Sequence, residues 1–152
     1  PKAGASGGSG AIQAAWMAPE PPEAPAFGGE LRLLGEEWAP YVCEHYSKSD
    51  IGGLEHIRQA IGAGMLGAFV DGTLAGFAGF HGEGSIGLLE VLPAYRRRGL
   101  GEALLRGAVR LALERGQYAF GQVLIDNAPS LALQKKVGMT LSEQPLYWLF
   151  RR

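Results

Sequence analysis

The chain has 152 residues, 47% of them hydrophobic, so it is long enough to form one domain with a buried core. Charged residues make up 19% and the formal net charge is -1, so we expect no nucleic-acid or membrane partner. Cys43 is the single cysteine, which excludes an internal disulfide and a cysteine-based metal cluster and fits a reducing cytoplasm. No apolar run approaches the ~20 residues of a membrane span.

The N-terminal part of the chain differs in composition from the rest. Residues 1–28 are rich in Gly, Ala, Ser and Pro and lack an apolar period, which predicts a tail or linker. A single domain is expected over residues 30–152. It begins with a short strand at 30–34, followed by two helices at 37–46 and 53–61.

The middle of the chain predicts antiparallel strands in series. Two apolar runs, 65–70 and 73–80, flank Asp71-Gly72, a pair that favours the positive φ angles of a two-residue hairpin turn. A second turn at residues 81–84 leads into a third strand over 85–91. These three strands are expected to pair in chain order.

The last part of the chain changes to a helical period and back. Leu100, Leu104 and Ala108 share one face of a helix that Gly116 can end. The apolar run 118–125 suits a strand covered on both faces. A second helix is expected from Asn127 to Val137, stopped by Gly138, with short strands at 139–141 and 146–150. The sheet is therefore expected to be mixed.

A basic, glycine-containing loop lies between a predicted strand and a predicted helix: Arg96-Arg97-Arg98-Gly99-Leu100-Gly101. Glycines let the backbone curl tightly, and the N-H groups of the first helical turn favour an anion. The arginines can pair with phosphate oxygens. A dinucleotide fingerprint would need glycine at Leu104, and a triphosphate loop would need Gly-Lys-Ser/Thr, which is absent. The alternative is a solvated basic turn.

Two linked motifs resemble those of the GNAT acetyltransferase superfamily. Glu90-Val91-Leu92-Pro93-Ala94-Tyr95, followed by the basic loop and an apolar helix, is similar to its cofactor-binding motif. Residues 123–130 and 133–139 resemble its strand, Asn-x-x-Ser helix and Lys-x-Gly-Phe close. The resemblance covers residues 30–152. Residues 92–96 and 147–150 look most like the glycine N-acyltransferase-like branch.

The resemblance implies a mixed α/β (α+β) fold, with a mainly antiparallel sheet, helices on both faces and a splayed central strand pair. It implies an acyl-CoA-dependent N-acyltransferase that passes an acetyl or other short acyl group directly to a primary amine of a small molecule or peptide. The alternative is a CoA-binding sensor or interaction module without turnover. Homodimerisation through the terminal strands is expected by analogy.

The cofactor in this reading is acetyl-CoA or another acyl-CoA. The resemblance implies that strand backbone at residues 89–91 receives the pantetheine amides and that the amides of residues 97–102 carry the pyrophosphate. The implied contacts are Leu89, Val91, Arg96, Arg97, Arg98, Gly99, Leu100, Gly101, Glu102, Asn127, Ser130 and Lys136.

The acid and the base are less well defined than the cofactor site. Gln134 stands where the superfamily often has a tyrosine that acts as the general acid. The leaving thiolate is then expected to take its proton from solvent or from the departing ammonium. His81, Glu83 and Ser85 are candidates for preparing the amine, the alternative being a solvated hairpin turn. Glu90, a carboxylate within an apolar run, is either a base or one half of a structural ion pair.

No metal is expected in this protein. The three histidines are His45, His56 and His81, and no two of them lie three or four residues apart.

Overall fold

A computed structural model describes residues 11–46 and 53–142. Within these ranges seven strands form one sheet in the order β3-β4-β5-β6-β7-β2-β8, antiparallel except between β6 and β7. In chain order the elements are β2 (Ala11–Ala15), β3 (Glu30–Leu33), the 3-10 helix η1 (Glu36–Trp38), α1 (Ala39–His45), α2 (Gly53–Gly64), β4 (Leu66–Val70), β5 (Thr73–Phe80), β6 (Ile86–Val91), the 3-10 helix η2 (Pro93–Tyr95), α3 (Leu100–Glu114), β7 (Phe120–Leu124), α4 (Ala128–Val137) and β8 (Thr140–Ser142).

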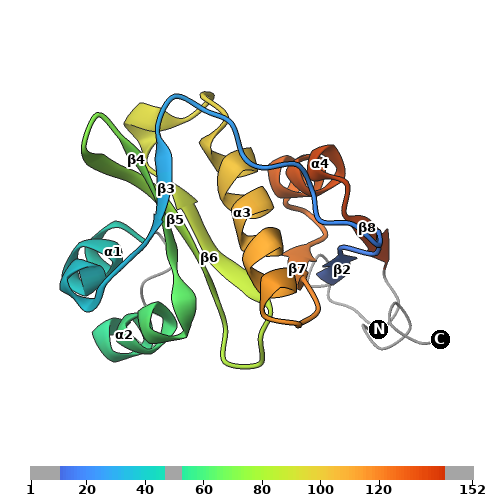
Figure 1. The fold of residues 1–152 in the computed structure, drawn as a ribbon, viewed down its shortest axis with the longest axis horizontal. Coiled ribbons are helices and arrows are strands. Elements are labelled where there is room, and N and C mark those ends of the chain that lie inside the picture. Colours follow the sequence, from blue (N-terminus) through green and yellow to red (C-terminus); the bar gives the residue numbers. More distant parts are fainter. Residues whose placement is uncertain (1–10, 47–52, 143–152) are drawn as a thin grey trace.

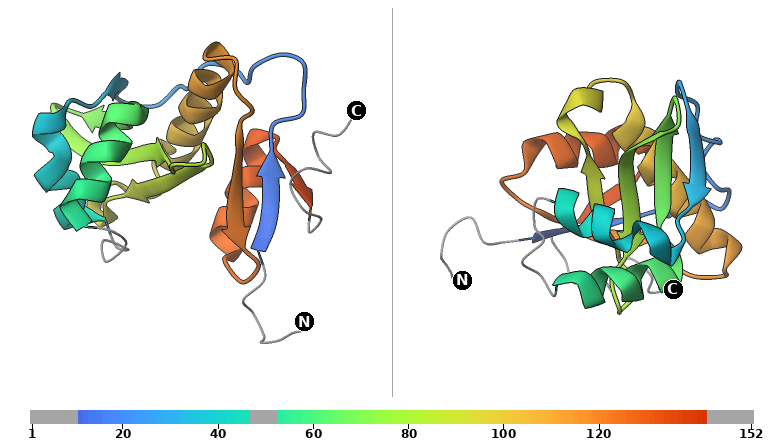
Figure 2. Two further views of the ribbon diagram at one scale, coloured as in Figure 1. Left: turned by 90° about the horizontal axis from the view of Figure 1, so that it is seen from below. Right: turned by 90° about the vertical axis from the view of Figure 1, so that its left-hand side faces the viewer.

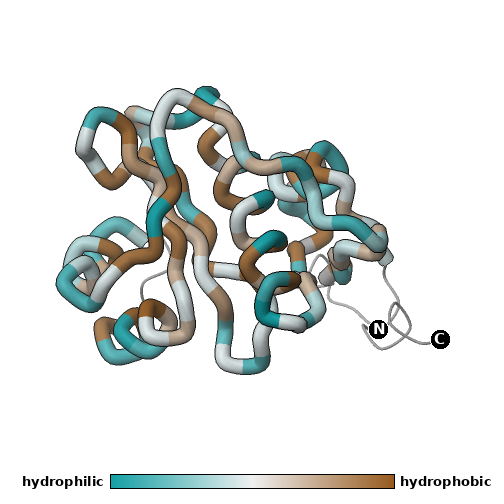
Figure 3. The backbone as a smooth tube through the Cα atoms, viewed as in Figure 1, coloured by the Kyte–Doolittle hydropathy of each residue, from teal (hydrophilic) through white to brown (hydrophobic). Residues whose placement is uncertain are grey.

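Helices cover both faces of the sheet, as the sequence predicts. Figure 1 shows α1 and α2 on one side of β4, β5 and β6, with α3 on the other side. Along α3, hydrophobic and hydrophilic segments alternate in Figure 3, because one face of the helix packs on the strands. None of the helices in the described ranges has the length and apolar character needed to cross a membrane.

The turn and cap glycines behave as their sequence context predicts. Asp71 and Gly72 have φ angles of 51° and 81° and join β4 to β5, which confirms the two-residue hairpin. Gly116 and Gly138 have φ angles of 71° and 109° just beyond α3 and α4. The predicted strand at 146–150 lies outside the described residues.

The N-terminal segment needs correction, because part of it belongs to the sheet. Residues 1–28 were expected to form a tail or linker, yet Ala11–Ala15 pairs antiparallel with β7 on one side and β8 on the other. Ala14 and Ala15 are fully buried. Small alanines carry little periodic signal, and their burial depends on strands more than 100 residues away, so local pattern could not identify this strand.

Two further elements differ in detail from the expectations. The helix expected at 37–46 is divided into η1 and α1, and Pro40 lies in the first turn of α1, where proline is tolerated. The run 118–125 was expected to be covered on both faces. Instead Val123 is buried while Gln122, on the opposite face of β7, is exposed. Ile125 is also exposed and lies beyond the end of β7.

The sheet divides at the contact between β6 and β7. These strands are parallel and pair at a single position, Ile86 opposite Gly121. A Cβ atom on Gly121 would lie 2.9 Å from the carbonyl oxygen of Ile86, so glycine permits this close approach. Figure 2 shows β6 and β7 diverging from there into two halves of the sheet, which is the predicted splayed strand pair.

Candidate active site

A pocket of about 970 Å³ lies between the diverging strands β6 and β7. Its walls include β6, the β5–β6 turn, β7 and α4, together with Tyr46 and His56. Of the residues that the sequence singled out, those lining the pocket are His81, Glu83, Ser85, Leu89, Glu90, Arg96, Asn127 and Ser130. The fold therefore brings β6 and the start of α4 to one pocket, whereas the predicted contacts Val91, residues 97–102 and Lys136 do not line it.

Strand β6 presents an irregular edge to this pocket. Its register against β5 pairs Gly79 with Gly87 and Phe77 with Glu90, so two residues, Leu88 and Leu89, stand opposite one. Leu88 has a φ angle of 53° in this bulge. A bulge interrupts the ladder and re-aims backbone groups. Backbone groups near Leu89 are thus available for a ligand that lies along the strand.

The loop between β6 and α3 has the backbone form of an anion site. Arg97 and Gly99 adopt left-handed φ angles of 65° and 83°. Gly99 is the N-cap residue of α3, and no side chain caps this end by a hydrogen bond. The first N-H groups of α3 lack intrahelical partners, and their partial positive charge favours an anion. The predicted phosphate contacts at residues 97–102 are compatible with this geometry.

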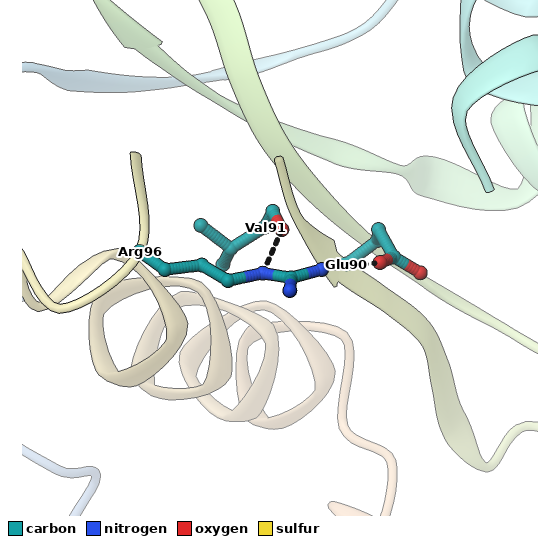
Figure 4. A network of polar contacts seen from close by, with 3 residues as sticks. All are labelled: Glu90, Val91 and Arg96. Atoms are coloured by element: carbon teal, nitrogen blue, oxygen red, sulfur yellow. Dashed lines mark hydrogen bonds and ion pairs between the residues drawn. The ribbon is translucent and has the colours of Figure 1, made fainter. Parts of the chain in front are cut away.

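The three loop arginines do not act together in the structure. Arg96 turns back to β6, where Nε donates to the Val91 carbonyl oxygen at 2.9 Å and Nη2 lies 3.3 Å from Glu90 Oε2 (Figure 4). The guanidinium carbon of Arg98 lies 5.4 Å from the centre of the Tyr95 ring. For Glu90 the ion pair expected from the sequence is present, and its role as a base stays a prediction.

Glu102 joins the two helices that flank the cofactor motifs. Its carboxylate lies 3.0 Å from Arg106 Nη2 on α3 and 3.2 Å from Lys136 Nζ on α4. Hydrogen bonds from Arg106 and then Lys136 hold the pKa of Glu102 below its usual range. Glu102 and Gly99 also line a second, small pocket of about 160 Å³ beside the N-terminal segment at Glu23. Lys136 therefore has a clear structural partner.

On the opposite wall, the α4 motif caps its own helix. Asn127 Oδ1 accepts a hydrogen bond from the backbone N-H of Ser130 at 3.2 Å. This bond satisfies one of the unpaired donors at the start of α4. Both residues line the pocket, so capping and ligand contact are compatible roles.

The β5–β6 turn gathers three of the four predicted catalytic residues. Ser85 is 3% exposed, and its hydroxyl donates to Glu83 Oε2 at 2.6 Å. This bond is the main reason that the pKa of Glu83 lies below its usual range, and His81 acts in the same direction. The backbone closes the turn, because the His81 N-H donates to the Ser85 carbonyl. These contacts are those of a closed hairpin turn, and the catalytic role of its residues stays a prediction.

Sequence reasoning missed two aromatic rings in the pocket wall. Tyr46, at the end of α1, is 8% exposed, and burial followed by the charge of Glu90 raises its pKa. His56 on α2 has its Nε2 buried without a hydrogen-bond partner among the described residues. Only the packing of α1 and α2 against β5 and β6 brings these rings to the pocket. Gln134, 8% exposed, also lines it.

The sequence profile of the acetyltransferase (GNAT) family matches residues 31–139, which is more than half of the chain. The chain belongs to the acetyltransferase (GNAT) family. GNAT enzymes use acetyl-CoA, and the pocket described above joins the two motifs of this family. Within the described residues no group of three or more His, Cys, Asp and Glu side chains is arranged to hold a metal ion.

Two curated GNAT relatives match part of the chain. A Bacillus subtilis (strain 168) protein, provisionally named ribosomal protein bS18-alanine N-acetyltransferase, is 37% identical over 73 residues, covering 45% of this chain and 48% of its own. The N-alpha-acetyltransferase RimI of Mycobacterium tuberculosis (strain ATCC 25618 / H37Rv) is 38% identical over 80 residues, covering 48% and 49%. The matches thus span about half the length of these relatives.

Solved structures with low sequence identity share the fold. A Drosophila protein superposes with a TM-score of 0.73 at 23% identity, over 87% of this chain and 48% of its own. AAC(6')-Iy, solved with a bisubstrate analogue that contains CoA, superposes with a TM-score of 0.63 at 17% identity, over 76% and 93%. These similarities establish the GNAT fold class predicted from the sequence.

Proposed function

We propose that this chain transfers an acetyl or other short acyl group from acyl-CoA to a primary amine of a peptide or small molecule. The observation that carries the proposal is the pocket between β6 and β7, which joins the bulged edge of β6 to the His81, Glu83 and Ser85 cluster. At the end of β6 the chain enters the left-handed loop that begins α3. These surfaces match CoA in order, because the edge of β6 suits the amides of the pantetheine arm and the loop suits its phosphates.

In this proposal the cofactor is held mainly by backbone. The exposed groups of β6 at Leu89 and Val91 bind the pantetheine amides, and the N-H groups of residues 97–102 bind the pyrophosphate. Arg97 and Arg98 add positive charge around that loop. Asn127 and Ser130 approach from α4. When bound, acyl-CoA supplies a thioester carbonyl for attack.

The chemistry requires two proton movements and no covalent intermediate on the protein. The amine loses a proton to His81 or Glu83, and its nitrogen attacks the thioester carbonyl carbon. The C-N bond forms, the C-S bond breaks, and the departing thiolate takes a proton from solvent or from the new ammonium. A backbone N-H of β6 stabilises the carbonyl oxygen as it gains charge.

The names of the two curated relatives make a peptide α-amine the first acceptor to test. The finer similarity to the glycine N-acyltransferase-like branch stays a proposal, and its C-terminal part, residues 147–150, lies outside the described residues. A cytoplasmic location stays an expectation, based on the single cysteine, Cys43.

Binding of the cofactor is the first experiment. Isothermal titration with acetyl-CoA and CoA should give micromolar binding, and an Arg98→Glu, Gly99→Glu double variant should lose it because two carboxylates repel the phosphates. CoA release is then followed with peptides that begin with alanine and with small amines. No binding of either ligand to a folded protein would contradict the proposal.

A second function is a CoA-binding module without turnover. Gln134, buried in the pocket wall, favours it because an amide cannot supply a proton to the thiolate. Tight CoA binding with no CoA release across the amine panel would support this module over the enzyme.

A further inference from the structure

The outer edge of β6 has backbone groups directed away from β5. The Leu92 N-H donates to the Ala75 carbonyl at 2.9 Å, so these two residues form a hydrogen-bonded antiparallel pair. The adjacent pair, Val91 opposite Gly76, is then non-hydrogen-bonded. In such a pair the N-H and C=O groups point away from the partner strand. The Val91 carbonyl therefore faces away from β5, on the edge where β7 has diverged.

An extended amide-bearing molecule can bind to such an edge by main-chain hydrogen bonds. On its outer side β6 pairs with a described strand only at Ile86, so the carbonyl of Val91 is not part of a ladder there. Instead it accepts the hydrogen bond from Arg96 Nε at 2.9 Å. The donor is the side chain of the first residue of the basic loop, residues 96–101.

The short helix η2 makes this contact feasible. It turns the chain back after β6, so that Arg96 lies beside a residue five positions earlier. Figure 4 shows the Arg96 side chain running along β6, with its guanidinium between Val91 and Glu90. The side chain is 56% exposed, whereas that of Glu90 is 11% exposed. The guanidinium can therefore move without unpacking the core.

We propose that Arg96 is a gate residue for the pantetheine arm, holding the Val91 carbonyl until an amide of the arm replaces it. This inference rests on the proposed function. The exchange substitutes one N-H donor for another at the same oxygen. The released guanidinium turns toward the phosphates bound by residues 97–102, where it adds a third positive charge to those of Arg97 and Arg98. Arg96 thus competes with one half of the cofactor and assists the other.

The alternative is a permanent structural role for Arg96. In that case Arg96 would hold the β6–α3 loop in place with and without cofactor, and its removal would weaken the binding of both halves of the cofactor. A gate opposes only the binding of the pantetheine arm. The measurable quantity is the dissociation constant of adenosine 3'-phosphate 5'-diphosphate divided by that of CoA, because this nucleotide carries the whole pyrophosphate and lacks only the arm.

Three variants separate the contributions of the hydrogen bond and the charge. Arg96→Met keeps the aliphatic stem but removes the donors and the charge. Arg96→Gln places an N-H donor where Nε stands but removes the charge and the Glu90 pair. Arg97→Met is the matched control on the same loop. Each dissociation constant is measured by titration of CoA or by displacement of CoA with the nucleotide, after circular dichroism has established that the variant is folded.

For a gate, Arg96→Met raises the ratio about tenfold, because a competing charge-assisted hydrogen bond is gone. The same variant binds the nucleotide within about twofold of the original protein, because without the arm Arg96 stays on Val91. Arg96→Gln leaves the ratio within about twofold of the original protein, and so does Arg97→Met. An unchanged or lower ratio in Arg96→Met, or equal ratios in the Met and Gln variants, would overturn the gate. If CoA fails to bind the original protein, the proposed function fails first.

Discussion

The imidazole of His56 on α2 lies beside that of His81 at the start of the β5–β6 turn, with ring centres 6.4 Å apart and planes inclined by 23°. The two residues are 25 positions apart and belong to different elements, yet both line the pocket. Gly87 makes room for this pair, because a Cβ atom there would contact the His81 ring. A side chain at position 87 would therefore displace His81.

His81 is expected to prepare the amine. Replacing His81 with Asn should lower kcat about 100-fold, the lower range of general acid-base catalysis, while CoA affinity is unchanged. Gly87→Ala should reduce kcat to a smaller extent, because it displaces the ring but keeps the imidazole. Steady-state kinetics with a peptide acceptor and CoA titration test both variants. Unaltered kcat in His81→Asn would remove His81 from the mechanism.

His56→Phe tests the buried nitrogen. The phenyl ring keeps an aromatic neighbour for His81 and removes Nε2, which is buried without a partner among the described residues. An unsatisfied buried polar atom costs about 1–3 kcal/mol, so the free energy of unfolding should rise by about 1 kcal/mol. Urea denaturation measures this change. A fall in stability would mean that Nε2 has a partner that the described residues do not provide.

Gly121→Ala should disturb the point where the sheet divides. The added Cβ would lie 2.9 Å from the Ile86 carbonyl oxygen, a backbone atom that cannot move independently. We expect a loss of about 1–3 kcal/mol of stability and weaker CoA binding. Gly82→Ala is the control, because nothing lies within 4 Å of its added Cβ. Equal stability of the two variants would show that β6 and β7 can separate further without cost.

The Glu102 cluster should give acid-dependent stability. Because hydrogen bonds lower its pKa in the folded state, Glu102 stabilises the protein above its usual value of about 4.5 and loses that effect as pH falls through the lower folded value. Glu102→Gln should therefore lower the free energy of unfolding by about 1 kcal/mol at neutral pH. The difference should shrink as the pH falls below about 4.5. Denaturation of both proteins across this range measures it, and a difference independent of pH would exclude an electrostatic origin.

Strand β2 should be needed for the β7–β8 half of the sheet. Ala14→Asp buries a charge between strands and should cost at least about 3 kcal/mol or prevent folding. Ala18→Asp, at an exposed position, should be neutral. A chain that starts at residue 16 tests the same point without adding a charge. If both the truncated chain and Ala14→Asp keep full stability, the N-terminal segment is a dispensable linker as the sequence suggested.

Short-range patterns determined much of this protein. Asp71-Gly72 specified a hairpin by its own φ preferences, and the 3.6-residue period specified α3. The order of strand, basic glycine loop and helix predicted an anion site and indicated the GNAT family. Each of these signals resides in residues close together in the chain. Steric and helical preferences act over that distance, so they can be read without the fold.

Only the tertiary structure decided what meets in the pocket. Strand β2 consists of small residues that gain stability solely from β7 and β8, and His56 reaches His81 because α2 packs on β5. The orientation of Arg96 toward Val91 depends on the turn at η2 and on the edge that β7 leaves open. Such relationships depend on burial and pairing between segments that are distant in the sequence. No local sequence pattern determines the free energy of these contacts.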